Sequence, residues 1–163
     1  MIAMLVEMYR RWLFEVWGRG DDAVATQLLA EDLVDHNRVP GQPAGREGDL
    51  WAARAVRKAF PDLRFAIDVA FEQDDLVTGR WTMTGTHTGP LDLMGIPPTG
   101  RRVNMSGQEI FRARDGKFVE VWHQEDIGAL MRGLELQPPP VMLRIAAWVS
   151  ARRYRRQLGN PSS

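Results

Sequence analysis

The stretch NMSGQEIFRARDGKFVEVWHQED, residues 104–126, decides the fold because it predicts two strands joined at Asp115-Gly116. The length of the loop between them determines which side chains share a face of this hairpin. A two-residue loop would place Glu109 and His123 on opposite faces, whereas a three-residue loop over 114–116, with its glycine in the left-handed conformation, would place them on the same face. The alternation of apolar residues along both strands favours the three-residue loop.

That register gives the hairpin one mainly apolar face and one polar face. The apolar face carries Met105, Gly107, Glu109, Phe111, Val119, Val121 and His123. The polar face carries Asn104, Ser106, Gln108, Arg112, Glu120 and Gln124. The apolar face therefore holds one carboxyl group and one imidazole, which form either a hydrogen-bonded structural pair or an acid/base pair at a site.

The strands before this hairpin follow the same two-residue period. Apolar residues alternate through RFAIDVAFE, residues 64–72, and again through LVTGRWTMTGTHTG, residues 76–89. One face of the second strand carries Val77, Gly79, Trp81, Met83, Gly85 and His87. Gly79 and Gly85 leave this face thin, and the missing side chains could make room for a ligand. Arg80 falls on the opposite face, where we expect a solvated charge.

Helices are predicted before these strands. Residues 3 to about 17 show the three- and four-residue spacing of an amphipathic helix, and Gly18 and Gly20 end it. Asp21 or Asp22 caps a short second helix, and a third helix runs from about residue 47 to residue 60. Helices followed by a mostly antiparallel sheet predict an α+β fold with the helices on one face of the sheet. Such a concave sheet can hold a pocket.

Composition limits the classes of protein that remain. The 163 residues suit one domain with a core, and 21 basic residues balance 21 acidic ones, so no net charge draws the chain to nucleic acid. The absence of cysteine excludes disulfides, thiol catalysis and cysteine-bound metals. It also favours a cytoplasmic protein. Charged residues interrupt the apolar N-terminus, so we expect a soluble chain without a signal peptide.

The C-terminal part differs from the rest of the chain. We expect a domain over 1–134, followed over 135–163 by a proline-rich linker and a basic amphipathic helix. This helix is expected to pack on the domain or on a second subunit. Contact with a membrane surface is less favoured, because the arginines gather at one end of the helix.

Residues 60–131 resemble the SnoaL-like polyketide cyclases and the related ester cyclases. The shared motifs are Phe60-Pro61-Asp62-Leu63, Arg80-Trp81-Thr82, Gly85-Thr86-His87-Thr88-Gly89, Pro98-Thr99-Gly100-Arg101, Asp115-Gly116-Lys117, and Glu120-Val121-Trp122 followed by Asp126. With the preceding helices, the likeness covers about the first 134 residues. It implies the cone-shaped fold of nuclear transport factor two, in which a curved, mixed, mostly antiparallel sheet wraps around three N-terminal helices, and it implies a homodimer.

The resemblance also implies a reaction. These cyclases close a ring by an intramolecular aldol reaction without metal or cofactor, using a carboxylate as general acid/base. Their acid/base aspartate falls at His123 of this chain, their pocket histidine at Glu109, and the glutamine two residues earlier at Gly107. Since either group can be tuned to serve as acid or base near pH 7, we expect Glu109 and His123 to form an exchanged catalytic pair.

Other residues are candidates for substrate binding. Trp81, Met83 and Phe111 are expected to shape the pocket wall. His36 or Asn37 would polarise a substrate oxygen, although Asn37 also suits a turn. His87 falls in a segment shared across different activities, which favours a role in the fold such as bonding loop backbone over substrate contact from the rim.

The residues also bear on metal binding and on other functions. No closely spaced histidine pair is present, so no metal is expected, and the resemblance implies no other cofactor. An epoxide hydrolase or epoxide-opening cyclase is an alternative on the same fold, but such enzymes use two carboxylates bridged by arginine, and Glu109 and Glu125 have no obvious arginine. A non-catalytic domain that binds a hydrophobic small molecule is the other alternative.

Overall fold

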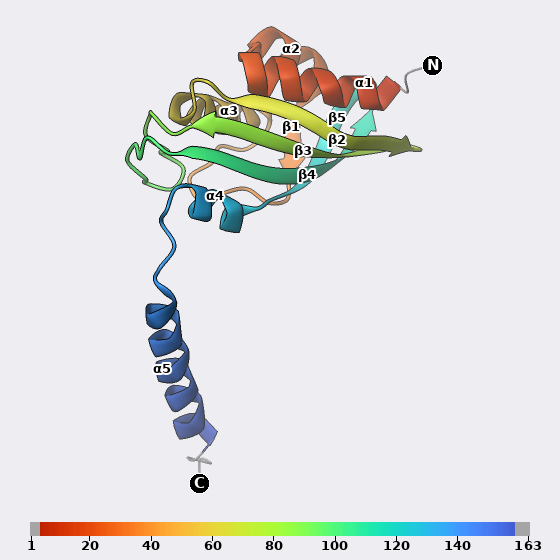
Figure 1. The fold of residues 1–163 in the computed structure, drawn as a ribbon. Helices are drawn as coiled ribbons and strands as arrows, with labels where there is room; N and C mark the ends of the chain where they lie inside the picture. The colour runs from red at the N-terminus through yellow and green to blue at the C-terminus, as the bar shows by residue number, and fades with distance from the viewer. Residues whose placement is uncertain (1–3, 159–163) are drawn as a thin grey trace.

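The structure, a computed structural model, describes residues 4–158 (Figure 1). Its helices are α1 (Met4–Arg11), the π-helix η1 (Trp12–Arg19), α2 (Asp22–Leu28), α3 (Arg46–Ala59), α4 (Ile127–Gly133) and α5 (Pro140–Leu158). Its strands are β1 (Leu29–Asp35), β2 (Arg64–Gln73), β3 (Leu76–Thr86), β4 (Arg102–Arg114) and β5 (Lys117–Glu125).

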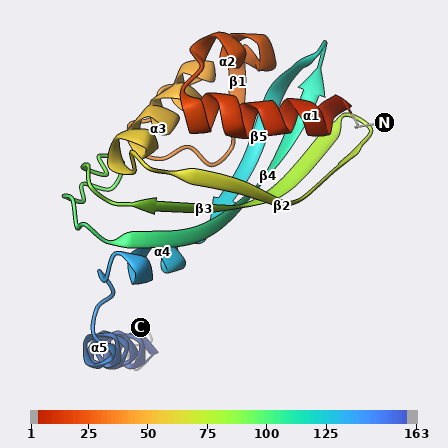
Figure 2. The same ribbon diagram turned by 45° about the horizontal axis from the view of Figure 1, so that its top comes forward.

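The strands form one curved sheet in the order β1-β5-β4-β3-β2. β1 lies parallel to β5, and the other neighbours are antiparallel. Figure 2 shows α1, α2 and α3 over the same side of this sheet, with α4 beyond β4. The predicted α+β fold, a mixed and mostly antiparallel sheet curved around N-terminal helices, is therefore confirmed.

The β4–β5 hairpin corrects the predicted loop. Arg114 pairs with Lys117, so the loop has two residues, and both Asp115 (φ 52°) and Gly116 (φ 75°) take the positive φ of a type I′ turn. The register then shifts, because Ala113 pairs with Phe118 whereas Arg112 pairs with Glu120. This bulge adds the residue that a three-residue loop would have supplied.

The bulge preserves the most important part of the prediction. Glu109 and His123 are directly paired on adjacent strands and share a face. The identity of one inward residue changes, because Phe118 is fully buried and Val119, expected on the apolar face, sits in the bulge.

The glycines of β3 do not make room for a ligand as expected. A Cβ on Gly79 would lie 2.3 Å from the Tyr9 ring, and one on Gly85 would lie 3.1 Å from Cβ of Phe60. Aromatic side chains from the helices already occupy these places. The thin parts of the sheet are therefore where the helices approach most closely.

The first helix is wound differently from the prediction. It is α-helical only as far as Arg11 and continues as η1 until Gly20, whose left-handed conformation (φ 81°) ends it. Hydrogen bonds in a π-helix join residues five apart. As a result Trp12 and Trp17, which an α-helix would separate by roughly 140° around its axis, lie with ring centroids 5.8 Å apart.

An aromatic core closes one end of the cone. The ring of Phe111 lies 4.8 Å from that of Trp12 and 4.4 Å from that of Phe118, measured between centroids. Tyr9 packs against the same cluster and is fully buried. Phe111 and Phe118 are therefore part of the packed core, whereas Trp12 also borders the open space between the helices and the sheet.

The helix α5 stands apart from the cone in both views (Figures 1 and 2). Val141, Met142, Leu143, Ile145 and Trp148 are all exposed on it. Packing on its own domain, one of the two expected arrangements, is therefore not observed; packing on a second subunit, like the homodimer itself, stays a prediction. Within the described residues, no helix has the length and apolarity needed to cross a membrane.

The arrangement of α5 predicts that the cone domain is stable without it. A chain that ends at Pro138 keeps the buried Leu134 and the ion pair between Arg101 and Glu135, so its melting temperature should stay within about 2 °C of the full-length value. A chain that ends at Gly133 also loses Leu134 and should be destabilised by about 2 kcal/mol or more. A large loss of stability in the chain that ends at Pro138 would show that α5 packs on the domain or on a partner subunit in solution.

Candidate active site

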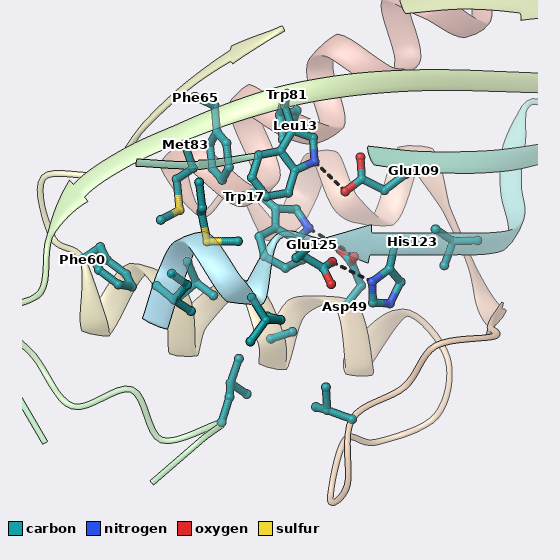
Figure 3. A pocket seen from close by; sticks show the side chains of 18 of the residues that line it. Leu13, Trp17, Asp49, Phe60, Phe65, Trp81, Met83, Glu109, His123 and Glu125 are labelled. Carbon is teal, nitrogen blue, oxygen red and sulfur yellow. Dashed lines mark hydrogen bonds and ion pairs between the residues drawn. The ribbon is translucent and has the colours of Figure 1, made fainter. Parts of the chain in front are cut away.

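A cavity of about 340 Å³ lies between the helices and the inner face of the sheet (Figure 3). Most of its wall is apolar: η1 contributes Trp12 and Trp17, and β3 contributes Trp81 and Met83. Its polar lining residues are Asp35, Gln42, Asp49, Glu109, His123 and Glu125. The cavity thus combines an apolar wall with several ionisable groups, as many small-molecule sites do.

Glu109 is a buried carboxyl group, 4% exposed, held by two aromatic side chains. The Trp81 indole donates a hydrogen bond of 2.6 Å to Oε1, and the Tyr9 hydroxyl donates one of 2.9 Å to Oε2. Burial raises the pKa of Glu109 to about 8, although both hydrogen bonds oppose the rise. Glu109 is therefore mostly protonated at neutral pH.

Gly107 explains how Trp81 reaches Glu109. A Cβ on Gly107 would lie 2.3 Å from the Trp81 ring, so the indole lies across the backbone where a side chain would otherwise stand. Gly107 and Glu109 are two residues apart on the same face of β4. The absence of a side chain at one position thus allows the hydrogen bond at the other.

His123 is held by a separate set of partners. Its Nδ1 lies 2.7 Å from Glu125 Oε1 and its Nε2 lies 3.1 Å from Asp35 Oδ1. Burial alone would lower the pKa of His123, but the hydrogen bonds and charges of the two carboxylates outweigh it and raise the pKa to about 10. His123 is therefore an imidazolium ion at neutral pH, and Figure 3 shows it beside Glu125 on the cavity wall.

Asp49 is a site residue that the sequence analysis missed. The indole nitrogens of Trp12 and Trp17 each lie 3.2 Å from one of its oxygens. Burial raises the pKa of Asp49 to about 6 against both hydrogen bonds. Helical periodicity offers one signal for it, because Asp49 stands four and seven residues before Ala53 and Val56 on the inward stripe of α3. Acidic residues are also common in the first turn of a helix, where they interact favourably with the helix dipole, so this signal alone does not identify a site residue.

The predicted wall residues are divided between the cavity and the core. Trp81 and Met83 line the cavity. Phe111 does not, because Trp12 and Phe118 cover it on both sides. Its inward direction was predicted, but the packing that closes this end of the cone could not be read from the strand pattern.

His36 and Asn37 lie in the turn after β1 and outside the cavity lining. The His36 ring stacks on Trp122 with 4.6 Å between centroids, and its Nε2 lies 3.1 Å from Glu120. The Asn37 side-chain oxygen accepts a hydrogen bond of 3.1 Å from the backbone N–H of His123. Asn37 therefore acts on the site through the backbone of β5, and no direct position for a substrate oxygen is visible at either residue.

His87 is fully buried at the start of the loop between β3 and β4. Its Nδ1 lies 3.1 Å from Thr99 Oγ1, its backbone N–H donates to the Arg101 carbonyl at 2.8 Å, and its carbonyl accepts from Gly100 N–H at 2.8 Å. Burial lowers the pKa of His87, which favours the neutral imidazole. These contacts close the loop, as the interpretation of a fold role expects, and His87 does not line the cavity.

Two aspartates cap helices, and the expected cap of α2 is one of them. Asp126 caps α4 by accepting a hydrogen bond of 2.8 Å from Ala129 N–H, and Asp21 caps α2 in the same way through Val24 N–H at 3.1 Å. Across residues 4–158, no group of three or more acidic or histidine side chains is arranged to hold a metal ion.

The fold and the cavity together define the class of protein. A cone of helices and curved sheet that encloses an apolar cavity with buried acid and base groups is a small-molecule site with the means for proton transfer. The chain belongs to the SnoaL-like polyketide cyclase family, whose model matches residues 7–134. The match ends before α5 begins.

Similar solved structures share the cone. A proposed polyketide cyclase from Bacillus cereus is 29% identical, with a TM-score of 0.70, and the match covers 83% of each chain. TsrD from Streptomyces laurentii is 27% identical, with a TM-score of 0.75, over 84% of this chain and 98% of that one. IdmH from Streptomyces antibioticus, also a proposed polyketide cyclase, is 30% identical, with a TM-score of 0.65, over 80% and 97%. The comparison with curated proteins found no match.

The burial of Glu109 predicts a pH-dependent difference in stability between the protein and its Glu109→Gln variant. The folded pKa of about 8 lies above the unfolded value of 4.5, so the stability of the native protein is fullest below pH 4.5 and falls as the pH rises towards 8. The amide has no such charge, and it can still accept from Trp81 and donate to the Tyr9 oxygen. The variant should therefore gain on the order of 2–4 kcal/mol relative to the native protein between pH 5 and pH 8.

Urea unfolding at pH 5, 6.5 and 8 would measure this difference. Glu31→Gln is the matched control, since Glu31 is exposed on β1 and its substitution should give no such trend. A constant difference between the native protein and Glu109→Gln over the whole range would show that Glu109 is ionised at neutral pH.

Proposed function

We propose that the protein is a cyclase or isomerase that acts on an uncharged, hydrophobic, carbonyl-bearing molecule by acid/base catalysis without a cofactor. The observation that carries the proposal is the pair of groups on β4 and β5. Glu109, a neutral acid, and His123, an imidazolium ion, face one apolar cavity from directly paired positions. Membership of the polyketide cyclase family supports the same class of reaction.

The two groups suit different parts of the reaction. Protonated Glu109 donates a hydrogen bond, and then its proton, to the carbonyl oxygen as an enol forms. The positive charge of His123 stabilises the negative charge that develops on that oxygen, and it does so strongly because the surrounding wall is apolar. In a ring closure, the enol carbon then bonds to a second carbonyl carbon of the same molecule while the enol oxygen returns its proton to Glu109 and becomes a carbonyl again. The second oxygen takes up the proton first removed from carbon and becomes a hydroxyl group.

The lining of the cavity supports an uncharged substrate. Among the described residues that line it, none is lysine or arginine, whereas four carry carboxyl groups: Asp35, Asp49, Glu109 and Glu125. A ligand carboxylate would lose its water without gaining a free cation, which is unfavourable. A ketone or an ester of the same shape has no such cost. Polyketide-like carbonyl compounds, the class that the family name describes, fit this requirement.

A second candidate function rests on one further contact. Asp35 and Glu125 are bridged by the cationic His123, in the way that epoxide-opening enzymes of this fold bridge two carboxylates by arginine. One carboxylate would activate water while another acid protonates the epoxide oxygen. Incubation with limonene oxide tests this candidate, because formation of the diol favours it over the first proposal.

β-Tetralone, a bicyclic hydrophobic ketone, tests the proposed function directly. Trp12, Trp17 and Trp81 line the cavity, so binding should quench tryptophan fluorescence. In D₂O, the protein should accelerate the exchange of hydrogen for deuterium beside the carbonyl group, which NMR follows. Glu109→Gln should bind the ketone, but its exchange rate should be lower than that of the native protein by a factor of about 100 at least.

β-Naphthoate serves as the charged control ligand. It matches β-tetralone in size but carries a carboxylate, and it should bind more weakly at pH 7. Binding of the ketone without any exchange would contradict the enzyme assignment and favour a binding domain. Equal binding of both ligands would contradict the uncharged substrate.

A further inference from the structure

The proposed reaction needs a base, and neither Glu109 nor His123 can supply it at neutral pH. Glu109 already holds its proton, because burial raises its pKa to about 8. His123 is also protonated, and both of its ring nitrogens are bonded to carboxylates, those of Asp35 and Glu125. The base must therefore be another group on the cavity wall.

We propose that Asp49 is the general base of this site and takes the proton from the carbon beside the substrate's carbonyl group. The assignment rests on the proposed function. The C–H bond breaks, its electron pair forms the C=C bond of the enol, and the carbonyl oxygen receives a proton from Glu109. When the enol returns to the ketone, Glu109 recovers its proton and Asp49 gives one to carbon, so no other reactant is consumed.

The partners of the four cavity carboxyl groups single out Asp49. Asp35 and Glu125 are ion-paired with His123, and Glu109 is protonated. Asp49, among the residues described, has no cation within ion-pairing distance; its recorded hydrogen-bond donors are two neutral indole N–H groups, one to each oxygen. Each oxygen therefore keeps a lone pair with which to accept a proton from a substrate.

The π-helix η1 produces this arrangement. The π-wound segment brings Trp12 and Trp17, which are five residues apart, onto one carboxylate while both rings also line the cavity. The two indoles fix the orientation of the carboxylate and place apolar ring surface beside it. Figure 3 shows Asp49 beneath the Trp17 ring and near His123.

Asp49 and Glu109 also stand on different walls of the site. Asp49 comes from α3, on the helical side, and Glu109 from β4, on the sheet. A flat ketone between the two layers would present its carbonyl oxygen to the sheet and a neighbouring carbon to the helix. This is the geometry that simultaneous donation and removal of a proton requires.

The charges around Asp49 keep it available as a base. Those that act on it are Asp35 on β1, His123 on β5 and Arg57 on its own helix. Burial is the largest influence and raises the pKa of Asp49 to about 6, so the carboxylate form predominates at pH 7. A base with this pKa and an acid with a pKa of about 8 are both in the working form between the two values.

The deuterium exchange of β-tetralone tests the assignment in the full-length protein. The rate should rise through about pH 6 and fall above about pH 8, giving a bell-shaped profile. Asp49→Asn should still bind the ketone, which tryptophan quenching would measure. Its exchange rate should be lower than that of the native protein by a factor of about 100 at least. Asp32→Asn is the matched control, because Asp32 is exposed on β1, and it should exchange at the native rate.

Trp17→Phe gives a second, independent readout. It keeps an aromatic ring on the cavity wall but removes one of the two hydrogen bonds that lower the pKa of Asp49. The acid limb of the profile should therefore move to higher pH, while the alkaline limb, which belongs to Glu109, stays in place. A merely structural role for Asp49 would change stability without moving the acid limb.

The outcomes separate the two proposals. Exchange by Asp49→Asn at close to the native rate, or an acid limb that Trp17→Phe does not move, overturns the role of Asp49 but leaves the proposed function standing if Glu109→Gln is still slow. A native protein that binds β-tetralone and never exchanges it overturns the proposed function, and the base assignment falls with it.

Discussion

The close approach of two aromatic rings to glycines of the sheet is the contact on which the site depends. Tyr9 occupies the space over Gly79, and Trp81 lies across Gly107. Both rings bring a hydrogen-bond donor to Glu109, so the packing that closes one end of the cone also buries and holds its carboxyl group. A β-carbon at Gly79 would displace the Tyr9 ring, and one at Gly107 would displace the Trp81 ring. Either change would also disturb a hydrogen bond to Glu109.

Burial and ion pairing have opposite effects on the two groups that share the inner face. Glu109 has only neutral partners, so desolvation dominates and keeps it protonated. His123 has two carboxylate partners, so ion pairing dominates and keeps it charged. Directly paired positions on neighbouring strands thus carry a neutral acid and a fixed cation, and no proton needs to pass between them.

Strand periodicity predicted which residues point inward but not what they meet there. It put Glu109, Trp81, Met83 and Phe111 on one face, yet Phe111 is covered by Trp12, which belongs to a distant helix. The loop length was wrong and the shared face of Glu109 and His123 was right, because a bulge replaced the expected loop residue. Asp49 was missed because the π-helical winding of η1 directs both tryptophans to it, whereas the sequence analysis assumed the α-helical spacing for this segment.

In the proposed mechanism, the exchange of acid and imidazole that the resemblance implies moves the base to another wall of the cavity, while the fold stays the same. The resemblance puts the cyclases' acid/base aspartate at His123, where this chain has a cation that two carboxylates hold in its charged form. A protonated carboxyl at Glu109 cannot replace that base at neutral pH. A carboxylate that two indoles orient from the opposite wall can, because proton removal requires a lone pair at the right carbon and a suitable pKa, and not a particular strand.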